Sequence, residues 1–405
     1  MAIMAAAGYN LVATAASAAG TTLAPDNFLS IDGNILWTSG DGGTWGWSNG
    51  PGPLVSGVNA GSHCTSAQQA AGAVYAEGAN GLFNCGEPNA TSSTGLPVPP
   101  VYTGPSNILA ETFESSPINT TTDSCGANTG SFSFNGGQQG KWDNGLSQLG
   151  WGVGSVPSKD ELANAFAVSR MNSLGQIEIY FGGQRIINNG DSHIDFQFLQ
   201  SMAGLTGVAN CSGGFSGQRE QGDFMFEINY DNGGALGNPA FYVWTCPGSQ
   251  PTGTACDTTG SWTTEPFPAN SAVATNAGGA ISCGGWVCEG ALGPSQVDTN
   301  EFMEGAVNLS GLPFSIGCAS NFFAQTRSSG SSSTSQLEAF TPPTTFATCT
   351  TPGVKTTPVD PTTGNPLTTI APNQQISDSM TVTGTTGLGT PTGTATFYVC
   401  SNTTT

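Results

Sequence analysis

The sequence predicts a mainly β protein, an antiparallel β-sandwich of the jelly-roll or lectin-like kind. Three segments, residues 175–183, 191–200 and 222–234, alternate apolar and polar side chains. A period of two places successive side chains on opposite faces of a strand. The segments are bounded by turns rich in Asn, Asp and Gly, which is typical of antiparallel sheets with one packed face and one solvated face.

The polar positions of these strands are the candidate ligand-binding residues. Because these positions fall on the face expected to meet water, their side chains could form hydrogen bonds with a sugar. Trp244 of the next predicted strand, residues 238–246, could provide an aromatic ring on which the sugar stacks. The alternative is that they only form the solvated face of a sheet. The candidates are Glu178, Tyr180, Asp195, Gln197, Glu227, Asn229 and Trp244.

Charge is scarce and strongly acidic. Only 8% of the 405 residues are charged, and seven Lys and Arg against 27 Asp and Glu give a net charge of −20. Affinity for nucleic-acid phosphates is built from clustered positive charge, so nucleic acid is not expected as a partner. The acidic balance permits Ca²⁺ binding, but it is equally that of an acidic solvated surface, and no other cofactor is indicated.

The cysteines indicate an oxidising compartment. None of the 11 cysteines forms the C-x-x-C pairs of a zinc or thioredoxin-like site. Disulfides, and therefore an extracellular or cell-surface location, explain them better. The disulfide candidates are Cys64 and Cys85, which lie in a turn-rich region, and the neighbours Cys246 with Cys256 and Cys283 with Cys288, although spacing alone does not decide the pairing.

The chain divides by composition into four parts. Residues 1–25 carry no charge and resemble the apolar part of a secretory signal. Residues 26–340 form the predicted disulfide-rich sandwich, residues 341–371 a linker rich in Thr and Pro, and residues 372–405 a truncated Ig-like domain. The partner of Cys400 is expected beyond Thr405. Beyond residues 1–25, no segment is apolar for the roughly 18 or more residues that a transmembrane helix needs.

One helix is predicted inside the sandwich, over residues 159–170. Ser158 followed three residues later by Glu161 matches a capping box, and Leu162 with Phe166 would give the helix an apolar edge.

Several segments together resemble the N-terminal region of large secreted or cell-surface bacterial proteins that continue into bacterial Ig-like repeats. They are "IDGN", "GSVPSKDELANAFA", "IYFGGQRIINNGDSHIDFQFLQ", "EGAVNLSGL" and "FFAQTRSSGSSSTSQLEAF", and "ISDSMTVTG" resembles the start of such a repeat. The resemblance implies an exported surface protein with a β-sandwich head and an Ig-like stalk. It brings no catalytic residues.

Three functions remain open from the sequence. The first is a secreted or surface-attached binding or adhesion module that recognises a glycan or another surface protein, and the second is a structural component of an envelope or filament. The third is a jelly-roll glycosidase, which needs two carboxylates close together. The E-x-D-x-x-E strand motif of such enzymes is missing around Asp195, so this reading depends on Glu178 and Glu227 converging from neighbouring strands.

Overall fold

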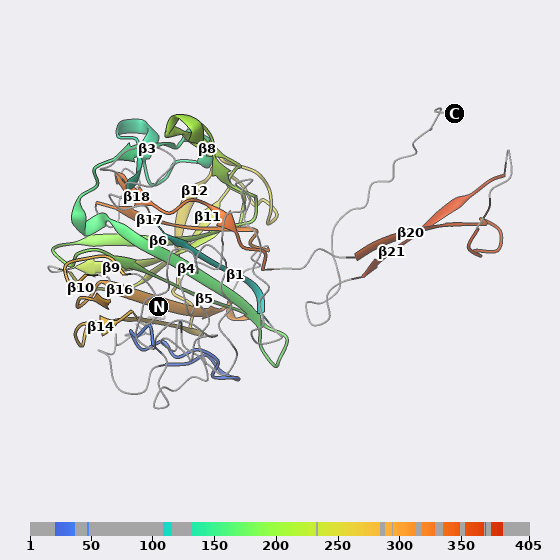
Figure 1. Ribbon diagram of the computed structural model, residues 1–405. Helices are drawn as coiled ribbons and strands as arrows, with labels where there is room; N and C mark the ends of the chain where they lie inside the picture. Colours follow the sequence, from blue (N-terminus) through green and yellow to red (C-terminus); the bar gives the residue numbers. More distant parts are fainter. Residues whose placement is uncertain are drawn as a thin grey trace, which may run out of the picture. The chain divides into compact units, whose positions relative to one another are not determined.

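The computed structural model describes residues 21–36, 47, 108–115, 131–231, 234–283, 288–293, 295–312, 318–328, 335–348, 353–367, 369 and 374–383. The chain forms two compact units, residues 1–348 and residues 349–405. The first unit contains two large antiparallel sheets, and its strands fill the main body in Figure 1. The predicted β-sandwich class is therefore confirmed.

The smaller sheet has five strands in the order β1-β4-β5-β16-β13. Every pairing is antiparallel, and the register shifts once in the pairing of β1 with β4 and once in that of β4 with β5. Its strands are β1 (Ile108–Ser115), β4 (Leu162–Met171), β5 (Ile177–Arg185), β13 (Ser271–Thr275) and β16 (Phe302–Asn308).

The larger sheet has 12 strands, ten of them in the order β12-β11-β9-β6-β17-β18-β2-β3-β8-β7. The other two, β10 and β19, pair with β9 and β17. A separate pair joins β14 (Ile281–Ser282) to β15 (Gln296–Val297). The described part of the first unit also contains short 3-10 turns: η1 (Gly137–Gly140), η2 (Leu146–Gln148), η3 (Ser158–Asp160), η4 (Val208–Asn210) and η5 (Leu309–Gly311). The strands of the larger sheet are β2 (Ser131–Phe134), β3 (Gly150–Gly154), β6 (Ser192–Leu199), β7 (Gly204–Leu205), β8 (Ser212–Ser216), β9 (Phe224–Asp231), β10 (Ala235–Leu236), β11 (Ala240–Thr245), β12 (Ser261–Glu265), β17 (Asn321–Arg327), β18 (Leu337–Phe340) and β19 (Thr344–Thr345).

Phenylalanine fills the space between the two sheets. Phe181 of the smaller sheet stacks on Phe226 of the larger sheet with ring centroids 5.0 Å apart, and its ring also contacts Phe196 at 5.0 Å. These residues belong to one buried cluster that draws on both sheets. The apolar positions of the three alternating segments thus form the core that the sequence predicts.

Both outer faces of the sandwich are also covered, which the sequence does not predict. Residues 23–35 and Trp47 pack on the outer face of the smaller sheet, against Phe166 and Tyr180. Residues 134–151 pack on the outer face of the larger sheet; β3, in this stretch, lies with β8 at the upper end of the main body in Figure 1. The polar positions of the central strands therefore lie under other parts of the chain.

The predicted helix over residues 159–170 is wrong. Only the turn η3 is helical there, and β4 follows it, paired with β1 and with β5. Even-numbered Phe166 and Val168 join the outer cluster, whereas odd-numbered Ala165 and Ala167 join the inter-sheet core. The Ala-rich sequence favours a helix locally, but burial of both faces of the segment in the fold outweighs this preference and makes it a strand.

Two of the predicted disulfides are present. Cys246 pairs with Cys256 and Cys283 pairs with Cys288, with Cα–Cα distances of 5.6 and 6.1 Å. Cys211 and Cys318 are disulfide-bonded as well. The candidates Cys64 and Cys85 lie outside the described residues, as do Cys400 and the signal-like segment up to residue 20.

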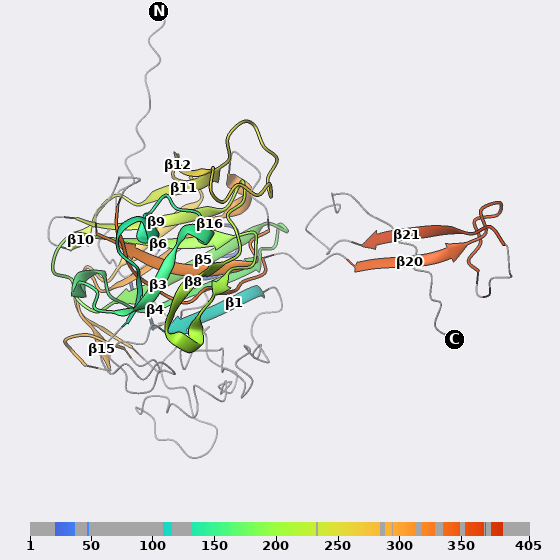
Figure 2. The same cartoon turned by 90° about the horizontal axis from the view of Figure 1, so that it is seen from above.

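The segment predicted as a linker, residues 341–371, is largely ordered as part of the two units. Thr341, Thr344 and Phe346 are buried in the first unit, because β19 pairs with β17 and Phe346 enters the inter-sheet core. In the second unit, β20 (Gly353–Val359) pairs with β21 (Ser377–Thr383), which lies in the segment predicted to start the Ig-like domain. Figure 2 shows β20 and β21 as a hairpin. Within the described part of the chain, no helix has the length and apolar character needed to cross a membrane.

Candidate functional site

The candidate site lies on the outer face of the larger sheet. On β6, the side chains of Phe196 and Phe198 enter the inter-sheet core, so Asp195 and Gln197 point to the other side. In the strand register Asp195 lies directly opposite Glu227 of β9 and opposite Gln325 of β17. Four of the predicted residues, Asp195, Gln197, Glu227 and Asn229, are thereby brought to one face.

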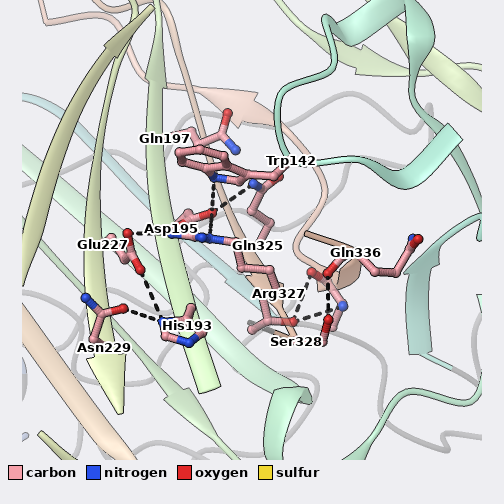
Figure 3. A network of polar contacts seen from close by, with 12 residues as sticks. Trp142, His193, Asp195, Gln197, Glu227, Asn229, Gln325, Arg327, Ser328 and Gln336 are labelled. Carbon is pink, nitrogen blue, oxygen red and sulfur yellow. Dashed lines mark hydrogen bonds and ion pairs between the residues drawn. The ribbon is translucent and has the colours of Figure 1, made fainter. Parts of the chain in front are cut away.

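A buried arginine bridges the two carboxylates. Arg327 Nε lies 3.2 Å from Asp195 Oδ2, and the guanidinium also contacts the Glu227 carboxylate. His193 Nδ1 lies 3.2 Å from Glu227 Oε1 and also contacts Asn229. Figure 3 shows this chain of contacts from Asn229 through His193 and Glu227 toward Arg327 and Asp195.

Trp142 covers the Asp195 and Arg327 side chains on the side away from the sheet. Its Nε1 donates to Asp195 Oδ2 over 3.1 Å, and the guanidinium carbon of Arg327 lies 4.4 Å from the centre of its ring. The ring also meets Tyr242 edge-on, with centroids 5.0 Å apart. Asp195 is fully buried and Glu227 is 1% exposed, so the solvated face expected for these residues does not exist here.

The environment moves the two carboxyl pKa values in opposite directions. Burial raises the pKa of Asp195 above its usual value, although Arg327 opposes the shift. Burial would also raise the pKa of Glu227, but the contact with His193 and the charge of Arg327 bring the pKa of Glu227 below its usual value. For His193, burial acts downward, and the contacts with Glu227 and Asn229 outweigh it, so its pKa rises.

Gln197 and Trp244 contact a second buried arginine, Arg219, on the same face. Arg219 Nη1 donates to Gln197 Oε1 over 2.8 Å. The guanidinium carbon lies 5.1 Å from the Trp244 ring and 4.7 Å from the Trp262 ring. Trp244 is fully buried, so it presents no exposed aromatic surface in this structure.

Glu178 and Tyr180 lie on the other sheet and take no part in this cluster. Tyr180 Oη donates to Glu178 Oε2 over 2.8 Å, and Arg170 Nη1 lies 3.5 Å from that same carboxylate oxygen. Both residues are buried beneath the segment around Phe28, whose ring centre lies 4.4 Å from the Arg170 guanidinium carbon. The convergence of Glu178 with Glu227 does not occur, because β5 and β9 belong to different sheets.

A third buried acidic residue, Glu304 of β16, holds the N-terminal segment. Its Oε1 accepts from the backbone N of Asp32 at 2.8 Å and of Gly33 at 2.6 Å, and its Oε2 accepts from Trp47 Nε1 at 2.5 Å. Burial raises the pKa of Glu304 well above its usual value, with a further contribution from the charge of Asp32. This carboxyl orders a turn and an indole, which explains its burial without a ligand.

Several residues of these clusters were not predicted from the sequence, among them Arg327, Trp142 and Glu304. The signal for Arg327 is present, because Phe323, Gln325 and Arg327 alternate on β17 and Arg and Lys are rare in this chain. Trp142 has no such signal, since it lies in a turn between η1 and η2, and only the fold brings it to Asp195.

Metal and cofactor sites find little support among the described residues. No three His, Cys, Asp or Glu side chains there gather in a way that could hold a metal ion. The sequence offers two oxygen-rich turns for calcium, residues 41–50 and residues 231–234. The first lies outside the described residues except for Trp47, and the second is described only at Asp231 and Gly234. Calcium therefore stays a prediction.

Comparison with known proteins finds no relative. No protein-family model, no curated protein and no solved structure matches this chain.

Proposed function

We propose that this protein is exported and works outside the cell as a non-catalytic module that binds carbohydrate. The observation that carries the proposal is the Arg327 bridge: the two carboxylates best placed for acid–base chemistry share one buried guanidinium. A general acid must release its proton to a substrate within hydrogen-bonding reach. Carboxylates held by an internal cation under an indole ring are better suited to accept hydrogen bonds than to transfer protons.

The compartment is inferred from the cysteines. The Cys246–Cys256 and Cys283–Cys288 disulfides close short loops, and Cys211 and Cys318 are oxidised too. Such bonds persist where glutathione and thioredoxin do not reduce them, which is outside the cell or in a bacterial periplasm. The proposal of an exported protein rests on these bonds together with the signal-like residues 1–25.

The ligand class follows from the chemistry of the face around Asp195. Amides, indoles and charge-paired groups dominate it, and each positive charge lies against a carboxylate, an amide oxygen or an aromatic ring. Binding sites for small ligands combine aromatic surface with a few well-placed polar groups. A neutral, hydroxyl-rich ligand such as a sugar suits that combination, whereas an ionic ligand would meet a like charge.

The test is a glycan array probed with the full chain. We expect binding to a defined set of neutral glycans, without release of reducing sugar from the same glycans in solution. The Asp195→Asn variant keeps the size of the side chain but weakens it as an acceptor, and it should bind the same glycans less tightly. A blank array would contradict the proposal and would favour the structural role in an envelope or filament.

A second candidate, a glycoside hydrolase, is favoured by one observation. Asp195 and Glu227 lie directly opposite each other on adjacent antiparallel strands, and their pKa values move apart. Side chains in that relation have Cβ atoms about 4.5–5.5 Å apart, and retaining glycosidases place their two carboxyl groups about 5–5.5 Å apart. Release of reducing sugar that is abolished by both Asp195→Asn and Glu227→Gln would establish this activity and replace the first proposal.

A further inference from the structure

The structure assigns a specific site to the proposed sugar binding: the polar surface beneath residues 141–148, where Trp142 takes the place of a sugar ring. We call residues 141–148 the cap. The inference rests on the proposed function, and it names the residues that would contact the ligand and the segment that must move.

The first observation is a group of buried polar atoms that have no hydrogen-bond partner within the described part of the chain. Gln197 and Gln325 lie on neighbouring strands of the larger sheet and are fully buried, as is Arg219, while Trp262 is 7% exposed. Buried polar groups are almost always hydrogen-bonded, so each exception requires a water or a ligand. The unpartnered atoms are Gln197 Nε2, Gln325 Oε1, Arg219 Nη2 and Trp262 Nε1.

These residues are linked to the cap by direct contacts. Gln325 Nε2 donates to Asp195 Oδ2 over 3.0 Å, and Trp142 Nε1 donates to the same oxygen over 3.1 Å. Figure 3 shows both side chains reaching Asp195. Arg219 Nε donates to the carbonyl of Asn144 over 3.0 Å, and the backbone N of Trp262 donates to Asp143 Oδ1 over 2.8 Å. The unpartnered groups therefore lie beside and beneath one segment.

The chemistry of this surface selects a neutral polyol. Three of the unpartnered atoms are donors and one is an acceptor, and sugar hydroxyls serve as both. A carboxylate or phosphate ligand would lie close to Asp195 and Glu227, and a cation would lie close to Arg219 and Arg327. The rings of Trp262 and Tyr242 supply the apolar surface on which the C–H face of a sugar can stack.

Trp142 makes the contacts that such a sugar would make. Its indole N–H donates to Asp195 as a hydroxyl would, and its flat ring lies on Arg327 and against Tyr242. A ligand that displaces the indole recovers these contacts and can also satisfy the Gln197 and Gln325 amides. Binding then needs only that the cap moves aside.

The cap is also attached next to the Cys246–Cys256 disulfide. Asp257, the residue after Cys256, accepts from the backbone N of Leu146 at 2.7 Å and of Ser147 at 3.0 Å, and from Ser147 Oγ at 2.5 Å. Gly145 lies so close that a Cβ there would be 1.8 Å from the Asp257 carbonyl oxygen. Gly145→Ala should therefore push the cap away from this loop.

The experiment uses the full chain and five named probes: cellohexaose, xylohexaose, mannohexaose, laminarihexaose and chitohexaose. Binding is measured by calorimetry and by tryptophan fluorescence up to about 10 mM sugar, which detects millimolar affinity. An opened cap raises the fraction of binding-competent protein, so Gly145→Ala should bind at least one probe roughly tenfold more tightly than the wild type. Gly152→Ala is the matched control, because a Cβ at Gly152 has its nearest neighbour 3.5 Å away.

Two further variants make the test decisive. If Gly145→Ala does not fold, Asp257→Ala weakens the attachment of the cap by removing one of its acceptors, and a gain in the same direction is expected. Gln197→Leu keeps the size of the side chain and removes its polar atoms, and it should abolish the gain in the Gly145→Ala background.

The outcomes separate this inference from the proposed function. Sugar binding that neither Gly145→Ala nor Gln197→Leu changes would overturn this site but leave carbohydrate binding intact. A folded, cap-opened variant with an acrylamide-accessible Trp142 that binds none of the probes would overturn the site as well, because ordered water alone would then satisfy the unpartnered atoms. A blank glycan array in addition would overturn the proposed function.

Discussion

Removing Arg327 should destabilise the first unit strongly. Its side chain is fully buried between Asp195, also fully buried, and Glu227, whose side chain is 2% exposed. Arg327→Met keeps most of the aliphatic length but leaves two like charges facing each other out of water. Breaking a buried ion pair by removing one partner costs about 3–5 kcal/mol. We expect a loss of that size in the free energy of unfolding at pH 7.

The assay is urea unfolding of the full chain, without reductant, followed by tryptophan fluorescence. All eight tryptophans lie before residue 349, so the signal reports on the first unit alone. The triple variant Arg327→Met, Asp195→Asn, Glu227→Gln removes all three charges at nearly constant volume. It should recover at least half of the lost stability, because no uncompensated charge stays buried.

Two results would refute this reasoning. A loss below about 1 kcal/mol for Arg327→Met would mean that the carboxylates are already neutral or reach water, since exposed ion pairs contribute about that much or less. A triple variant as unstable as Arg327→Met would mean that Arg327 acts by packing against Trp142 and not by charge.

Three other changes should alter stability in measurable ways. Burial raises the pKa of Asp223, and also that of Glu301, to about 7. Between about pH 4 and pH 8 the folded state therefore holds more protons than the unfolded state, so stability should fall as the pH rises through this range. A urea midpoint that does not change with pH, or one whose pH dependence is unchanged in Asp223→Asn, would contradict this. Replacing Cys246 and Cys256 by Ser should lower the free energy of unfolding by about 2–3 kcal/mol, because the bond closes a short loop, and cysteine mapping of the unreduced, denatured wild type should find both thiols unreactive. Trp47→Phe should cost about 1–3 kcal/mol by urea unfolding, because it leaves Glu304 Oε2 buried without its indole donor; an unchanged midpoint would show that another group replaces the donor.

Local pattern predicted the strands but not what covers them. Alternation identified β5, β6 and β9 because Phe196, Phe226 and their neighbours fill a core between sheets, and that core imposes a period of two. The same alternation cannot tell a solvated polar face from a buried one. Asp195 and Glu227 are buried because Trp142 and Arg327, distant in sequence, meet them in the fold.

The missed strand β4 has a related cause. Ser158 and Glu161 match a capping box, and the alanines that follow favour a helix in isolation. Pairing with β1 and β5 decides otherwise, because both faces of the segment are buried and small side chains fit between two packed layers. Only non-local contacts carry that information, and local propensity does not include them.

The attachment of residues 32 and 33 to Glu304 has a consequence for how the protein matures. The hydrogen bonds join positions 272 and 271 residues apart, so residues 32 and 33 cannot reach their native contacts during synthesis until Glu304 has left the ribosome. Contacts of such long range slow folding. Until then the aromatic outer surface of β4 and β5 stays uncovered, so this nascent protein should depend on a holding chaperone until its last strands arrive.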